Sequence, residues 1–159
     1  MENLLSAVVF LLDGHPYAIE ALKVREIVGG ANFEPLSIEG EVERFIQIRG
    51  KAAKVVDLRG RLGIPSAAKE GLNSFVAVQI SGTERNRLAA LWVDSLLDLI
   101  HVPMDQLKPL PLSFRPIRPK YIKAVIEGEM EPVCVLNLDE ILKDGVGGEG
   151  EIALGNKAS

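Results

Sequence analysis

The chain of 159 residues has the length of one compact domain or of two small intertwined ones, and hydrophobic residues make up 47% of it, enough for a core. Aromatic residues are only 5%, so aliphatic side chains must fill that core. A net charge of −4 gives no long-range attraction for phosphate backbones, and we expect no nucleic-acid binding. The single cysteine, Cys134, excludes an internal disulfide and is consistent with a reducing compartment.

The start of the chain has neither a secretory signal pattern nor a membrane-spanning pattern. Glu2 and no basic residue precede the first apolar run, which is the wrong charge for a secretory signal. Asp13 ends that run well short of the roughly 20 apolar residues that a membrane helix needs. We therefore expect a cytoplasmic protein with no direct membrane insertion.

Short strands joined by turns are predicted for the first part of the chain. Asp13 and Gly14 separate apolar residues 8–12 from residues 17–19, which predicts a β-hairpin because both turn residues tolerate positive φ. The hydrophobic spacing over residues 42–48 is ambiguous between helix and strand, and we expect a short helix there.

The next segments continue the pattern into a second half of the chain. Residues 54–58 predict a strand, and residues 59–63 predict the turn that ends it. The small polar residues 66–73 predict a linker or surface loop, after which the strand pattern repeats. Strands are expected in this second half at residues 75–80, 88–93, 96–102, 122–126 and 133–138, the last two as a hairpin.

The end of the chain predicts one helix and a tail. Residues 139–142 are expected to form the beginning of a short helix, with Asn137 or Asp139 as its N-cap. From residue 145 onward the chain is glycine-rich, and we expect it to be disordered. Two sets of short strands with few helices predict an all-β barrel architecture in two halves.

Few residues are candidates for catalysis or metal binding. Neither His15 nor His101 has a histidine or cysteine at metal-ligand spacing, and both are typical of partly exposed loop histidines. Cys134 lies between two valines and is expected to be buried and unreactive. Asp94 and Asp98 would suit the acid–base pair of a small hydrolase, or they are turn-forming residues at strand ends. We assign no catalytic, cofactor-binding or metal-binding residue.

An arginine and an aspartate in the middle of the chain suggest a different role. In a strand, Asp57 and Arg59 would share one face while Val56 and Leu58 face a core. The planar guanidinium could then orient a partner-contacting loop. The alternative is an ordinary surface ion pair, worth only about 0–1 kcal/mol.

Several motifs in a fixed order resemble the CheW-like family, which includes chemotaxis coupling proteins and the regulatory domain of the kinase CheA. The resemblance covers residues 6–143 and leaves residues 144–159 as a flexible tail. The matching segments are the opening hairpin at residues 9–19, the Val-x-Glu-Ile pattern at residues 24–27, the central signature at residues 48–50 and 55–59, the second signature at residues 91–96 with residues 109–111, and the closing segment at residues 133–142.

The resemblance implies two packed five-stranded Src-homology-3-like β-barrels with short helices, including one at the C-terminus, and neither enzymatic activity nor a cofactor. It implies an adaptor between a methyl-accepting chemoreceptor and a CheA-type histidine kinase, in chemotaxis or in a parallel pathway such as pilus motility. A regulatory fragment related to a kinase and a small hydrolase are the alternatives. The residues expected to bind protein partners are Val24, Glu26, Ile27, Arg49, Gly50, Asp57 and Arg59.

Four positions depart from the family pattern. Gln47 replaces an asparagine, and Arg44 replaces a glycine. Ala52 and Lys54 stand where the family has an apolar residue and a proline. Because proline lacks a backbone donor, Lys54 is expected to change the edge of its strand. These changes make the region basic and bear on partner choice.

Removal of residues 146–159 is expected to leave the melting temperature nearly unchanged. This segment has too few clustered apolar residues to offset an ordering cost of about 1–2 kcal/mol per residue. Thermal melts of the full and shortened chains test this, and a fall of several degrees would show that the segment docks on the domain.

Overall fold

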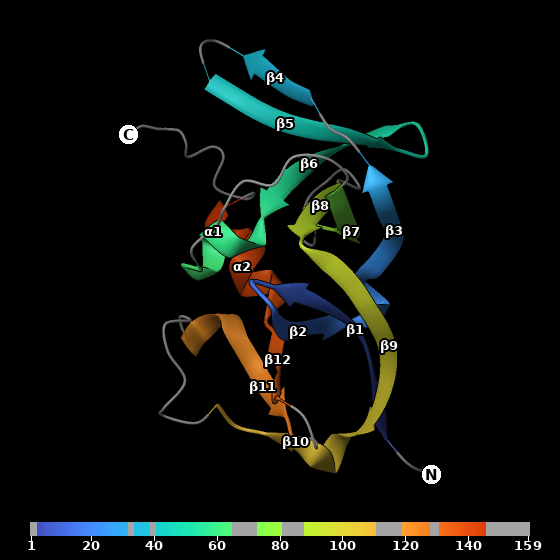
Figure 1. Cartoon of the computed structure of the whole chain (residues 1–159), viewed down its shortest axis with the longest axis vertical. Coiled ribbons are helices and arrows are strands. Elements are labelled where there is room, and N and C mark those ends of the chain that lie inside the picture. The colour runs from blue at the N-terminus through green and yellow to red at the C-terminus, as the bar shows by residue number, and fades with distance from the viewer. Residues whose placement is uncertain are drawn as a thin grey trace.

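The computed structural model describes residues 3–31, 34–38, 41–64, 73–80, 88–110, 119–127 and 131–145. Its strands form two packed six-stranded sheets (Figure 1). The terminal sheet takes strands from both ends of the chain, in the spatial order β10 (Leu107–Lys108), β11 (Ile122–Ile126), β12 (Val133–Leu136), β2 (His15–Glu20), β1 (Leu4–Leu12) and β9 (Ser95–Pro103). The central sheet has the order β3 (Val24–Ala31), β7 (Asn73–Gln79), β8 (Leu88–Val93), β6 (Lys51–Asp57), β5 (Glu41–Ile48) and β4 (Glu34–Ile38).

Helices are short and few in the described part of the chain. Two are α-helices, α1 (Leu58–Leu62) and α2 (Leu138–Gly145), and three are 3₁₀ turns, η1 (Ala21–Lys23), η2 (Met104–Gln106) and η3 (Pro119–Tyr121). The expected all-β class with a C-terminal helix is confirmed. Each sheet is mixed, with one parallel pairing, and has six strands where five were expected.

The opening hairpin forms as predicted. Leu12 pairs with His15 across a two-residue turn, in which Asp13 and Gly14 have φ angles of 54° and 80°. Two successive positive φ angles match the right-handed twist of the flanking strands. The hairpin therefore continues the twist of the terminal sheet.

The predicted helix at residues 42–48 is wrong, because this segment lies in strand β5. Phe45 pairs with Glu34 on one side and with Lys54 on the other, so neighbouring strands satisfy the backbone that a short helix would leave open. Ile46 and Ile48 are buried, as alternation in a strand requires. The same pairing corrects the expectation for Lys54, which lies in an interior strand between β5 and β8 and not at an edge.

The predicted turn at residues 59–63 is helix α1. Asp57 caps the helix, because its Oδ1 accepts a hydrogen bond from the Arg59 backbone N–H at 3.1 Å. Gly63 ends it in the left-handed region at φ 76°. Val56 and Leu58 are buried as expected, but Arg59 is helical, so Asp57 and Arg59 do not share a strand face.

The two halves of the sequence do not correspond to the two sheets. Strands β7 and β8 follow the predicted linker but pair with β3 and β6 in the central sheet. The chain instead passes between the sheets at η1 and at Asp94, the residue between β8 and β9. Residues 65–72, most of the predicted linker, lie outside the described part of the chain.

One apolar core, here called the shared core, lies between the sheets. It includes Val8, Phe10 and Ile19 from the terminal sheet. Val76 and Leu91 join it from the central sheet. Its other members, among them residues of both α-helices, are Leu12, Tyr17, Val56, Leu58, Leu62, Ile64, Val78, Ile80, Ala89, Val93, Tyr121, Val125, Cys134, Leu136, Leu138, Ile141 and Leu142. Two smaller cores fill the sides of the sheets away from this interface.

Helix α2 is joined to this core by its cap and by helix α1. The Asn137 Oδ1 accepts a hydrogen bond from the Glu140 N–H at 3.3 Å, which confirms one of the two predicted N-caps. Asp139 lies inside the first turn, where its carboxylate meets Lys23. Arg61 of α1 donates to the carbonyl of Ile141 at 3.0 Å.

Asn137→Ala is expected to lower the free energy of unfolding by about 1 kcal/mol, because it removes the acceptor for an orphan N–H of α2. The matched control is Asp139→Ala, whose side chain is 62% exposed. Urea denaturation of both variants measures the difference. Equal losses would contradict the capping role.

Candidate protein-binding surface

A β-bulge in strand β3 places two predicted binding residues on one face. Val24 pairs with Val78 and Ile27 with Val76, and the register shifts between Val24 and Glu26. Directly opposed residues share a face, and both partners belong to the shared core. Val24 is half-buried against that core, whereas Ile27 is 47% exposed. Without the bulge, residues three apart would face opposite sides of the strand.

Strand β9 repeats this arrangement in the terminal sheet. Leu96 pairs with Phe10 and Leu99 with Val8, and the register shifts in between. Both partners belong to the shared core, so Leu96 and Leu99 lie on the side of β9 that faces it. Leu96 packs against the core, while Leu99 is 53% exposed. Leu97, at the shift, is 57% exposed.

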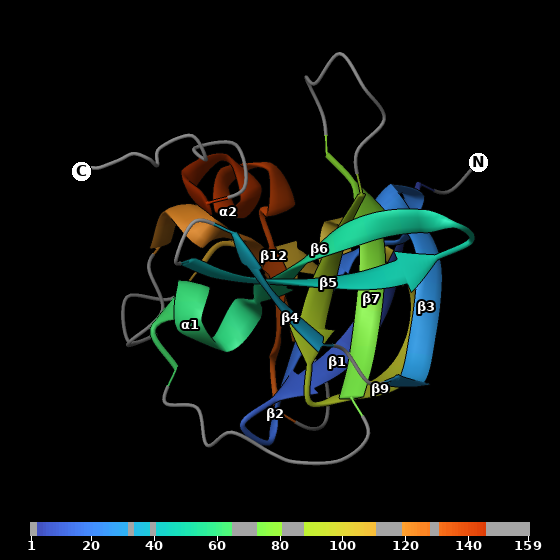
Figure 2. The ribbon, with the colours of Figure 1, turned by 90° about the horizontal axis from the view of Figure 1, so that it is seen from above.

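Together these residues form what we call the apolar strip: Val24, Ile27, Leu96, Leu97 and Leu99. Its inner members pack against the shared core, and its outer members are exposed. Both views place β3 and β9 on the same side of the molecule (Figures 1 and 2). The three leucines of β9 were not predicted as site residues, because the apolar segment there predicted only a strand.

Glu26 and Arg49, both predicted site residues, are brought together by the curl of the central sheet. Strand β3 is at one edge of that sheet, and the β5–β6 turn extends from strands on its far side. The Arg49 Nε nevertheless donates to the Glu26 Oε1 at 2.7 Å. Glu26 pairs with Ala77, on the face of β3 opposite the apolar strip. The ion pair therefore contacts β3 on the face opposite the apolar strip.

The backbone at Arg49 is strained. Arg49 and Gly50 have φ angles of 52° and 81° in the two-residue turn between β5 and β6. Gly50 adopts this conformation freely, whereas a residue with a Cβ loses roughly 1–2 kcal/mol in the left-handed region. The Arg49 side chain is 81% exposed. The two-residue turn requires this positive φ, as it does at Asp13 in the opening hairpin.

Asp57 and Arg59 belong to helix α1 and its N-cap and are not members of the apolar strip. The Arg59 side chain is 3% exposed, and its Nη1 donates to the Asp94 Oδ1 at 2.5 Å. Its Nε contacts the Asp57 Oδ1 at 3.4 Å, and its guanidinium lies 4.7 Å from the centroid of the Trp92 ring. Arg59 therefore belongs to the interior. That Arg59 contacts a partner stays a prediction.

The two aspartates of the hydrolase alternative have different environments. Both Asp94 oxygens accept hydrogen bonds, Oδ1 from Arg59 and Oδ2 from the Asp13 N–H at 2.6 Å. Asp98 is exposed on β9, and its Oδ1 accepts from the Leu99 N–H. Asp94 is thus engaged in structural contacts.

Of the remaining candidate residues, the two histidines contact other side chains and the cysteine is protonated at neutral pH. His15 contacts Glu131, and the His101 Nδ1 lies 2.7 Å from the Ser6 Oγ. Burial, with a smaller contribution from Glu131, raises the pKa of the Cys134 thiol to about 11, so the reactive thiolate is scarce at neutral pH. Among the residues that the structure describes, no group of three or more His, Cys, Asp or Glu side chains could hold a metal ion.

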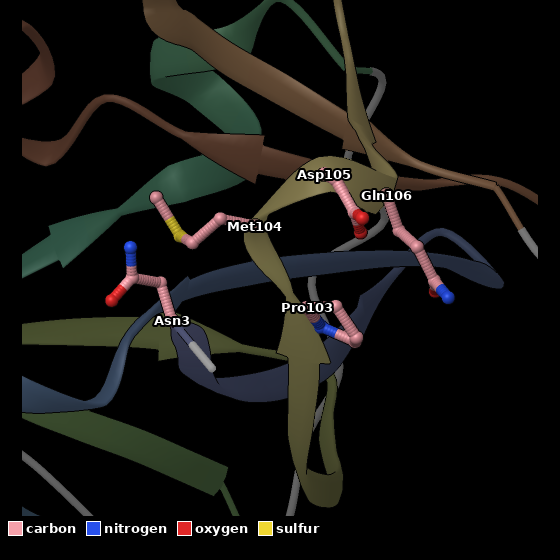
Figure 3. A pocket seen from close by; sticks show the side chains of 5 residues that line it. All are labelled: Asn3, Pro103, Met104, Asp105 and Gln106. Atoms are coloured by element: carbon pink, nitrogen blue, oxygen red, sulfur yellow. The ribbon is translucent and has the colours of Figure 1, made fainter. Parts of the chain in front are cut away.

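A pocket of about 480 Å³ lies at the end of β9, away from the predicted site residues (Figure 3). Its lining residues are Asn3, Pro103, Met104, Asp105 and Gln106. The backbone N–H of Met104 donates to the Asn3 carbonyl at 2.9 Å. Separately, no helix in the described part of the chain is long and apolar enough to cross a membrane.

The positions that depart from the family pattern lie near the Arg49 turn. Gln47 pairs with Ala52, and both are exposed. Lys54 is half-buried. The side chain of Arg44 is outside the described part of the structure. Exposed Arg49 and Lys51 make the tip of the β5–β6 hairpin basic.

Comparisons with known proteins agree on one family. The model of the CheW-like domain matches residues 6–146. The chain is 23% identical over 135 residues to the chemotaxis protein CheW of Rhizobium meliloti (strain 1021), covering 84% of each protein. It is 21% identical over 139 residues to a probable chemotaxis protein CheW of Rhizobium etli, covering 86% of each.

A solved structure shows the same fold. The scaffolding protein TtCheW from Thermoanaerobacter tengcongensis superposes with a TM-score of 0.72 at 23% identity, over 90% of this chain and 94% of that one. The curled mixed sheets described above therefore correspond to the two barrel-like halves of that fold. Because the family model spans nearly all of the described residues, the chain belongs to the CheW-like family of scaffold and coupling proteins.

Proposed function

We propose that this protein is a cytoplasmic adaptor that binds a chemoreceptor through the apolar strip and couples it to a CheA-type histidine kinase. The observation that carries the proposal is the pair of bulges in β3 and β9, each of which turns an exposed aliphatic residue to the side of the shared core. Exposed apolar side chains that continue a core are typical of protein-binding surfaces. The curated relatives are described as chemotaxis proteins, which supports this class of partner.

The Glu26–Arg49 pair supports the proposal through shape and charge. It holds the β5–β6 turn against the face of β3 opposite the apolar strip, and this contact keeps the position of β3 fixed. Because the Arg49 side chain is 81% exposed, its remaining donors are available to a partner. An exposed ion pair contributes little to stability, so its role would be in binding.

The partners themselves can be identified directly. A pull-down from the source cell with the purified protein is expected to recover a chemoreceptor and a histidine kinase. Recovery of a pilus-pathway receptor would place the adaptor in a parallel chemosensory system. Recovery of neither protein class would overturn the proposal.

Arg49→Ala is expected to lower affinity for the receptor by about tenfold, the scale on which a central interface residue is distinguished from its neighbours. The fold should persist, because the lost ion pair is exposed. Binding titrations and thermal melts of the variant and of a Lys51→Ala control measure both effects.

A second variant separates the side chain from the backbone strain. Asparagine tolerates positive φ, so Arg49→Asn should melt at or above the parent temperature and still bind weakly. Parent-like binding by both Arg49 variants would exclude this residue from the receptor site. If Lys51→Ala weakens receptor binding equally, the effect comes from the net positive charge of the hairpin tip and not from Arg49 itself.

Ile27→Ser and Leu99→Ser are each expected to lower receptor affinity by about tenfold, with little change in melting temperature, because both side chains are half-exposed in the free protein. Met104→Ser is the matched control, since Met104 is 46% exposed but lies on η2 beside the pocket. Titration against the same receptor compares the three variants. A loss with Met104→Ser as large as the others would show that the strip is not the site.

A further inference from the structure

Asp94 links the two sheets at the point where the chain crosses between them. It follows the last residue of β8 in the central sheet and precedes β9 in the terminal sheet. Its backbone N–H donates to the Leu11 carbonyl at 3.1 Å, and its Oδ2 accepts from the Asp13 N–H at 2.6 Å. One residue thus ties the crossing to the tip of the opening hairpin.

Arg59 orients the Asp94 carboxylate from the other side. It donates to the Asp94 Oδ1 at 2.5 Å from helix α1, which follows β6 of the central sheet. The Arg59 Nε lies 3.4 Å from the Asp57 Oδ1, and the guanidinium carbon lies 4.7 Å from the centroid of the Trp92 ring. The side chains of Arg59 and Asp94 are only 3% and 11% exposed, so water screens this pair weakly.

The hairpin tip offers a backbone donor whose exchange can report on this contact. In a two-residue hairpin turn, the N–H of the first turn residue points away from the ladder and is left to solvent. Here that residue is Asp13, and its N–H is bonded to Asp94. Its exchange with solvent therefore reports on the orientation of the Asp94 carboxylate.

We propose that Arg59 is a positioning residue that locks the opening hairpin to helix α1 through Asp94, so that the two sheets move as one body. The shared core stabilises the contact between the sheets, but apolar contacts are non-directional. The planar guanidinium between two carboxylates supplies the direction. Its Nη2 is buried without an acceptor among the described residues, so the contacts of Nε and Nη1 set the orientation of the guanidinium.

The lock also bears on the binding surface. Leu96, Leu97 and Leu99 follow Asp94 within the next five positions of the chain, so the start of the apolar strip is set by the same contact. This consequence rests on the proposed function. The lock itself concerns only the free protein and is tested without a partner.

The test is amide hydrogen exchange, measured by NMR on the full chain for the parent and Arg59→Met. Exchange at Asp13 is expected to accelerate by about tenfold relative to amides in β7 and β8, a factor that corresponds to about 1.4 kcal/mol. The side-chain bonds of Arg59 go to Asp57 and Asp94, and Asp13 is bonded to Asp94, so a purely space-filling role would not single out the Asp13 amide. The control is Arg61→Met, which removes the other arginine of α1 and its bond to Ile141.

Selective acceleration at Asp13 with Arg59→Met but not with Arg61→Met supports the lock. Unchanged exchange at Asp13, or acceleration equal to that throughout β7 and β8, overturns it. If Arg59→Met does not fold, Arg59→Lys serves instead, because it keeps the charge but lacks the planar fork that sets the directions of the bonds to the two carboxylates. The same two outcomes then decide the question, whatever the receptor titrations show.

Discussion

The shared core between the two sheets is the interaction on which the rest of this structure depends. It takes residues from strands at both ends of the chain and from the strands between them, so neither sheet has its buried face covered until the other is present. Strands β1 and β2 reach their neighbours β9 and β12 only after the central sheet has intervened in the sequence. Burial of aliphatic surface drives this closure, in a chain with few aromatic residues.

The binding surface we propose follows from where that core ends. A sheet with regular alternation would bury every second residue of β3 and β9 against the core and turn the others to the opposite face. A bulge in each strand instead sets a half-buried and an exposed aliphatic residue three positions apart on the same face. The core therefore extends to the molecular surface along two strands, and its outer part is available to another protein.

The sequence predicted the features whose causes are local. Asp13-Gly14 carries its own turn preference, and Asn137 caps the helix that follows it. The grouping of Val24, Glu26, Ile27 and Arg49 came from resemblance to a family, and the structure brings Glu26 and Arg49 into contact. The bulge that places Val24 and Ile27 on one face leaves no pattern in a single sequence.

Features that depend on distant partners could not be predicted. Residues 42–48 have spacing compatible with a helix, and pairing with two other strands decides otherwise. Strands β7 and β8 follow a linker-like segment, yet they complete the sheet that precedes it. Arg59 was paired with Asp57 because the two are close in sequence, whereas its shortest contact is to Asp94, 35 residues away.

The central signature contains two arginines that differ in burial, and this difference separates their functions. Arg59 is 3% exposed and bonded to the largely buried Asp94, where removing one charge leaves the other buried and uncompensated. Arg49 is 81% exposed, and its ion pair with Glu26 is open to solvent. A residue that holds the fold must be shielded from water for its charge to act strongly, while a residue that recognises a partner must be reachable. The same short motif therefore supplies an internal lock and an external contact, and only the three-dimensional structure distinguishes them.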